Sequence, residues 1–105
     1  MNEDRAYISR LVDIYGNALS ERQKDVVDLY YNEDLSLAEI SEHCGITRQG
    51  VRDAIRHGVE TLISLESALG FHKKSEKVAS LVSDIQNCED INRAKAIADL
   101  IIGEL

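Results

Sequence analysis

The stretch Leu37–Arg56 restricts the fold more than any other part of this sequence. Two helices that cross near a right angle need a small residue where they approach, and Ser41 supplies it. The turn between them needs a residue that tolerates a positive φ and then an apolar plug, which are Gly45 and Ile46. The second helix needs a cap and inward-facing apolar residues, which are Thr47, Val51, Ala54 and Ile55. Because these residues occur together in register, the stretch predicts a helix-turn-helix unit.

The second helix of this unit has a polar face that suits nucleic acid. Its candidate binding residues are Thr47, Arg48, Gln49, Arg52 and Arg56. Arg pairs with guanine and Gln with adenine in the major groove, and either residue also holds phosphates. The Thr47 hydroxyl and the free N–H groups of the helix start can bind a phosphate. Two interpretations stay open, because such a face is also merely solvated in units that serve packing or protein docking.

Helical periodicity extends over the rest of the chain. Proline is absent and glycine occurs 6 times, so residues that break helices are rare. Apolar residues three and four apart predict helices in 4–18, 20–31, 36–44 and 48–69, and from 75 and 91 onward. Ser20 with Gln23 and Ser36 with Glu39 fit capping boxes, and Ser75 fits a third N-cap. No segment has the pattern of a strand.

These elements predict an all-α fold. We expect a core of three or four helices with the helix-turn-helix unit in residues 1–71, and a C-terminal helical extension in residues 72–105. Gly70 and Phe71 are expected to end the fourth helix, with the aromatic ring folding back on its last turn.

The fourth predicted helix has an apolar seam along its whole length. The seam consists of Val51, Ile55, Gly58, Leu62, Leu65 and Leu69. It is longer than one crossing helix covers, so either the two C-terminal helices or a second subunit is expected to cover it. We favour a homodimer, which would suit a palindromic DNA site.

The net charge of the chain does not favour nonspecific binding along nucleic acid. The formal net charge is -7, whereas such proteins are usually basic. Any nucleic-acid contact must therefore come from a local basic patch. An acidic surface around Asp25, Asp28, Glu33 and Asp34 is interpreted as solvated, with docking of a basic partner as the alternative.

No sequence feature indicates catalysis, metal binding or membrane insertion. The cysteines and histidines show no metal-binding spacing, and no Gly-rich phosphate loop or nucleophile–base motif occurs. The N-terminus lacks the apolar core of a signal peptide, and no apolar run is long enough to span a bilayer. We therefore predict a cytoplasmic protein that is not an enzyme, with no cofactor, no metal and no membrane association.

Three segments together resemble a known family. These are Leu19–Gln23, the aromatic pair Tyr30–Tyr31, and Asp34–Ile40 ahead of the turn. In this order they resemble the YlxM family, small bacterial proteins similar to region 4 of sigma factors. The likeness covers about residues 5–70. It implies a sigma region 4-like core of the winged-helix-like DNA-binding superfamily without the wing, DNA binding, and an association with the signal recognition particle pathway.

The recognition helix departs from the pattern expected of that family. Gly50 and Arg52 stand where Ala and Tyr are expected. The added Arg favours phosphate contact, whereas the lost Tyr removes a stacking contact.

Two functions follow from these observations. The first is a DNA-binding transcriptional regulator linked to the signal recognition particle pathway. The second is an adaptor that contacts the particle's RNA or its GTPase and modulates protein targeting, an alternative that the net acidity favours.

Overall fold

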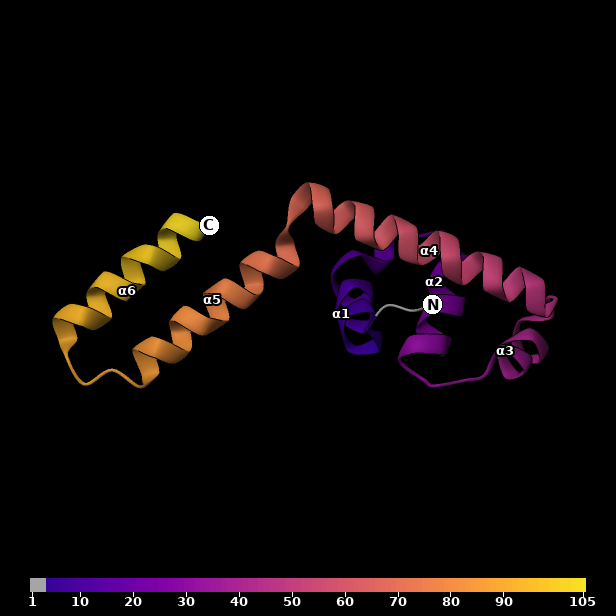
Figure 1. Ribbon diagram of the computed structural model, residues 1–105, viewed down its shortest axis with the longest axis horizontal. Helices are drawn as coiled ribbons and strands as arrows, with labels where there is room; N and C mark the ends of the chain where they lie inside the picture. Colours follow the sequence, from indigo (N-terminus) through magenta and orange to yellow (C-terminus); the bar gives the residue numbers. More distant parts are fainter. Residues whose placement is uncertain (1–3) are drawn as a thin grey trace. The chain divides into compact units, whose positions relative to one another are not determined.

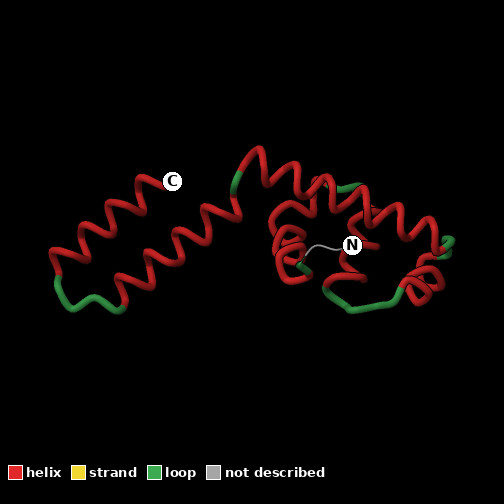
Figure 2. The backbone as a smooth tube through the Cα atoms, in the orientation of Figure 1, coloured by secondary structure: helices red, strands yellow, loops and turns green. Residues whose placement is uncertain are grey.

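The computed structural model describes residues 4–105, and all of its regular elements are helices. The predicted all-α class is therefore confirmed for these residues. Figure 1 labels the helices in chain order, and Figure 2 shows the loops that join them. The elements are α1 (Arg5–Tyr15), a 3-10 turn (Gly16–Ala18), α2 (Glu21–Tyr31), α3 (Leu37–Cys44), α4 (Arg48–Leu69), α5 (Phe71–Gln86) and α6 (Ile91–Glu104).

The chain divides into two compact units at the junction of Leu69 and Gly70. The N-terminal unit contains α1 to α4, and the C-terminal unit contains α5 and α6. The domains proposed from the sequence, 1–71 and 72–105, divide the chain two residues further along.

The N-terminal unit is built around α4, on which α1, α2 and α3 all pack. Its core contains fully buried side chains from each of the four helices, including Ile8, Val26, Ile40 and Ile55. Helices α2 and α4 approach closely at Gly58, where an added Cβ would lie 2.8 Å from Val27 Cγ2. A glycine is therefore required at this crossing, because any side chain would push the two helices apart.

The seam of α4 is buried over its first part within this unit. Val51, Ile55, Gly58 and Leu62 are all buried against α1, α2 and α3. The expectation that the C-terminal helices or a second subunit cover this part was wrong. Sequence periodicity shows that a face is apolar, but it does not show which element covers it. Leu69, at the far end of the seam, is 46% exposed.

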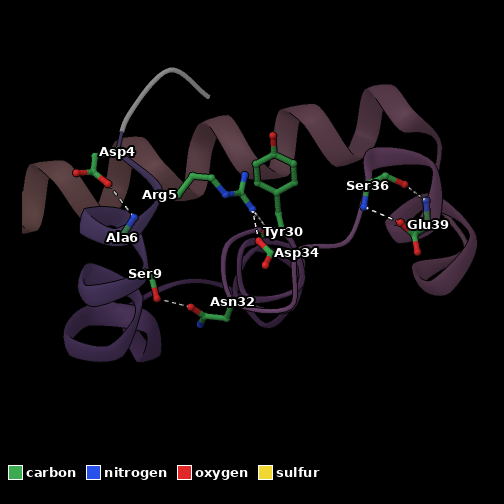
Figure 3. A network of polar contacts seen from close by, with 9 residues as sticks. All are labelled: Asp4, Arg5, Ala6, Ser9, Tyr30, Asn32, Asp34, Ser36 and Glu39. Carbon is green, nitrogen blue, oxygen red and sulfur yellow. Dashed lines mark hydrogen bonds and ion pairs between the residues drawn. The ribbon is translucent and has the colours of Figure 1, made fainter.

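A polar network fixes the loop that leads into α3 (Figure 3). Arg5 of α1 donates to the carbonyl oxygen of Tyr30 and, at 3.0 Å, to Asp34 Oδ1, and its guanidinium carbon lies 4.6 Å from the centre of the Tyr30 ring. The Ser9 hydroxyl donates to Asn32 Oδ1, and Asp34 itself adopts a φ of 55°. Asp34 of the acidic surface thus helps to hold this loop through its contact with Arg5.

The C-terminal unit is a pair of antiparallel helices joined by residues 87–90 (Figure 1). The predicted cap at Ser75 was wrong, because α5 begins four residues earlier. Gly70 is left-handed, with φ 67°, and its carbonyl oxygen already accepts the Lys74 N–H at 2.9 Å. Since no breaker separates Phe71 from Ser75, a new helix starts directly after this glycine.

Candidate nucleic-acid interface

The turn of the helix-turn-helix unit has the conformation that its residues predict. Gly45 is left-handed, with φ 66° and ψ 34°. The Ile46 N–H donates to the carbonyl oxygen of Ser41 at 3.2 Å, and the Ser41 hydroxyl donates back to the carbonyl oxygen of Ile46. Ile46 also packs against the core cluster. These contacts fix the direction in which α4 leaves the turn.

Both helices of the unit are capped at their N-termini. In α3 the Ser36 hydroxyl accepts the Glu39 N–H at 3.1 Å, and the Glu39 carboxylate accepts the Ser36 N–H at 3.0 Å (Figure 3). This predicted capping box is confirmed. Because its carboxylate accepts the Ser36 backbone N–H, the pKa of Glu39 lies below its usual value. In α4 the Thr47 hydroxyl accepts the Gly50 N–H at 2.9 Å, which confirms Thr47 as the cap.

The five predicted binding residues are exposed at the start of α4, namely Thr47, Arg48, Gln49, Arg52 and Arg56. Arg48, Arg52 and Arg56 are four residues apart, so each is turned by about 40° from the previous one along about 12 Å of helix. This spacing therefore puts the three arginines on one side of α4.

Two of these arginines have no protein partner. Within residues 4–105, no hydrogen bond or ion pair engages the side chain of Arg48 or Arg52. Their donors are therefore available to an external acceptor such as a phosphate.

Asp53 is a residue of this surface that sequence reasoning missed. Its Oδ1 accepts a hydrogen bond from Gln49 Nε2 at 3.0 Å and lies 3.6 Å from Arg56 Nη2. The spacings of four and three residues along a helix were the signal that could have revealed both contacts. Asp53 lowers the positive charge of the face and occupies the Gln49 amide, which is needed for an adenine contact.

The contacts of Asp53 are weak enough to be exchanged. The side chains of Arg56 and Asp53 are 61% and 45% exposed, and ion pairs in such positions contribute only about 0–1 kcal/mol. A phosphate that approaches Arg56 can therefore compete with the Asp53 carboxylate for the Arg56 guanidinium. Arg48 and Arg52 form the free part of the basic face, and Gln49 and Arg56 its internally paired part.

A hollow lies between α2 and α3. It has a volume of about 250 Å³ and is lined by Asp25, Asp28, Leu29, His43 and Cys44. Arg22 of α2 closes one side by donating to the carbonyl oxygen of Cys44 at 3.1 Å. In the part of the chain that the structure describes, no three His, Cys, Asp or Glu side chains lie in an arrangement that suits a metal ion.

Comparison with known proteins identifies the family. The family model UPF0122, described as "Putative helix-turn-helix protein, YlxM / p13 like", matches residues 2–100. This chain belongs to that family. The resemblance to YlxM proteins is thereby confirmed, and the match extends past the N-terminal unit into α5 and α6.

Individual relatives carry the same family name. A UPF0122 protein of Clostridium kluyveri is 45% identical over 76 residues, which cover 72% of this chain and 68% of the relative. One of Desulforamulus reducens is 46% identical over 79 residues, covering 74% and 68%. One of Clostridium botulinum is 37% identical over 97 residues, covering 92% and 87%.

Across residues 4–105, none of the helices combines the length and the hydrophobicity needed to cross a lipid bilayer.

Proposed function

We propose that this chain binds duplex DNA in the cytoplasm through the first half of α4, as a transcriptional regulator connected with the signal recognition particle pathway. The observation that carries the proposal is the pair of exposed side chains of Arg48 and Arg52, which have no hydrogen-bond or ion-pair partner within residues 4–105. They project from a helix whose entry is fixed by Gly45 and Thr47. The membership of the chain in a helix-turn-helix family agrees with this use of α4.

Within this proposal, the contacts divide between anchoring and base recognition. Arg48 and Thr47 lie at the N-terminus of α4, where free N–H groups favour a phosphate. Arg52 lies one turn further along the helix and is placed to reach a guanine edge or a second phosphate. Gln49 reads a base only after its amide leaves Asp53 Oδ1. We therefore assign affinity to Arg48 and Arg52, and a smaller share to Gln49 and Arg56.

The proposal assigns no catalytic role and no cofactor to the chain. It includes a homodimer, since two copies of α4 would read two half-sites about 34 Å apart on one side of the duplex.

A salt-titrated fluorescence anisotropy assay tests the choice of ligand. It compares a random duplex DNA with the RNA of the signal recognition particle, using the full chain. DNA binding is expected to weaken steeply as salt rises, because each phosphate contact releases counterions. Absence of DNA binding even at low salt would contradict the proposal.

A second function is favoured by Asp53 and by the net charge of -7. Both reduce attraction to a densely charged duplex. The alternative is an adaptor that contacts the particle's RNA or its GTPase through the same arginines. It expects tighter binding to the RNA than to the duplex, or a change in GTP hydrolysis by the particle when the chain is added. An unchanged rate of GTP hydrolysis together with no RNA binding would contradict it.

A further inference from the structure

The C-terminal unit buries very few of its apolar side chains. Leu81 is its one buried hydrophobic side chain, and α6 contains none. In contrast, Val82, Ile91, Ile102 and Leu105 are between 40% and 88% exposed. Units of fewer than about 40 residues usually need a disulfide, a metal or a partner to hold together.

The unit has no such internal support. Cys88 is its single cysteine, so it can form no disulfide of its own. No group of metal-ligating side chains is present within residues 70–105. A contact outside the unit is therefore the remaining source of stability.

Most of the exposed apolar residues of the pair lie on one face, whereas Leu100, which is 59% exposed, lies on the other. In α6 the half-buried residues that face α5 are Ala94, Ile97, Ile101 and Glu104. Four other apolar residues are all rotated away from this stripe in the same direction around the helix axis, namely Ile91, Ala98, Ile102 and Leu105. In α5, Ser75, Ala79 and Val82 are turned in the same sense from the stripe that faces α6. In an antiparallel pair, positions displaced in the same sense from both contact stripes lie on the same side.

The surface hollows of the pair agree with this assignment. One hollow of about 420 Å³ is lined by Phe71, Ser75, Val78 and Ala79 from α5 together with Leu105, and also by Lys74 and Glu104, which line the second hollow as well. A separate hollow of about 590 Å³ is lined by Lys73, Glu76 and Lys77. The two sides of the pair thus differ in character. We call the side with Ser75, Ala79, Val82, Ile91, Ala98, Ile102 and Leu105 the apolar face.

We propose that the apolar face packs against the same face of a second copy of this chain, forming an antiparallel bundle of four helices. The seven residues of the face carry no charge, so its best partner is a surface that is equally apolar and uncharged. A second copy supplies that surface. Nucleic acid and anionic lipid both require clusters of cations, whereas the hollow on this face is lined by a single lysine, Lys74, together with Glu104.

The distribution of side-chain size fits a two-fold axis. Ala79 and Ala98 lie near the middle of the face, with Ile102 and Leu105 toward one end and Val82 and Ile91 toward the other. In a two-fold arrangement the alanines of the two copies meet at the centre, where the helices approach closely. The larger side chains at each end of the apolar face then contact those at the opposite end of the partner's face.

The area of the face agrees with a dimer of moderate affinity. A helix of the length of α5 is about 24 Å long, and two adjacent helices are about 20 Å wide. The two copies together would bury about 1,000 Å², which is near the lower bound of stable interfaces. We therefore expect a dissociation constant of about 1 µM or above. The inference deepens the proposed function, because the partner would supply the second recognition helix.

The mass of the full chain in solution, measured without DNA, tests this surface separately from DNA binding. Sedimentation velocity over a wide range of concentration is expected to show a monomer–dimer equilibrium. Ile102→Glu, which places a charge on the apolar face, should raise the dissociation constant by roughly a hundredfold or more. Leu100→Glu is the matched control, because Leu100 is a comparably exposed residue of α6 on the other side and should leave the dimer intact.

Circular dichroism of both variants checks that helix content is retained. A wild-type chain that stays monomeric at all concentrations would overturn the proposal. The same holds if Ile102→Glu and Leu100→Glu shift the equilibrium equally. If the chain is a monomer and only Ile102→Glu lowers its melting temperature, the apolar face makes its contact within one chain. That result also overturns the proposal.

Cross-linking locates the contact. With Cys44 and Cys88 replaced by Ser, Ala98→Cys should form a disulfide-linked dimer faster than Ala96→Cys, since Ala96 lies on the opposite side of α6. Equal rates would contradict the proposed face.

Discussion

The two units of this chain are built from equally periodic helices, yet they bury very different amounts of apolar surface. In the described part of the N-terminal unit, thirteen hydrophobic side chains are buried, from Ile8 to Leu62. In the C-terminal unit only Leu81 is buried. Three helices that pack on α4 enclose a core with it, whereas two antiparallel helices can enclose only the stripe between them. Periodicity therefore predicts helices equally well in both units, but it does not predict whether a unit can bury its own apolar side chains.

The largest expected effect tests the core of the N-terminal unit. Leu62→Ala should lower the free energy of unfolding by about 2–5 kcal/mol, because it removes a fully buried side chain and leaves a cavity. Leu69→Ala, in the same helix but 46% exposed, should cost much less. Urea denaturation measures both. Similar losses for the two variants would mean that the end of α4 is covered in solution.

The next effect contrasts a glycine from each unit. Gly58→Ala should destabilise the chain by about 1–3 kcal/mol, because its Cβ would lie 2.8 Å from Val27 Cγ2. Gly103→Ala in α6 meets nothing within 4 Å and should stabilise that helix by up to about 1 kcal/mol. Thermal unfolding followed by circular dichroism compares them. A neutral Gly58→Ala would contradict the close crossing of α2 and α4.

The smallest effect concerns the capping box of α3. The folded-state pKa of Glu39 is lowered from 4.5, so its stabilising contribution is complete above that pH and is lost as the pH falls through the folded-state pKa. Glu39→Gln should therefore lower the melting temperature at neutral pH, with a difference from wild type that shrinks in acid. Glu42→Gln, on the same helix but outside the box, is the control. A difference that does not depend on pH would show that the ionised carboxylate is not what stabilises the cap.

Local chemistry explains which parts of the structure were predictable. Gly45, Ser36 and Thr47 act on neighbours within a few residues, so their caps and turn followed from the sequence. The start of α5 and the covering of the α4 seam depend on which elements meet in space. The predictions made from the sequence for these two features were wrong. At the candidate interface, the exposure of Arg48 and Arg52 was predictable, whereas the pairing of Asp53 with Gln49 was overlooked although its spacing was visible.

The salt dependence of DNA binding by three forms of the chain tests whether the first half of α4 holds duplex DNA. Arg52→Ala and Arg93→Ala remove the same charge, one from the basic face of α4 and one from α6. The account predicts that Arg52→Ala weakens DNA binding and lowers the slope of log K against log salt by about 0.9, whereas Arg93→Ala leaves that slope unchanged. Equal slopes for all three forms would contradict it.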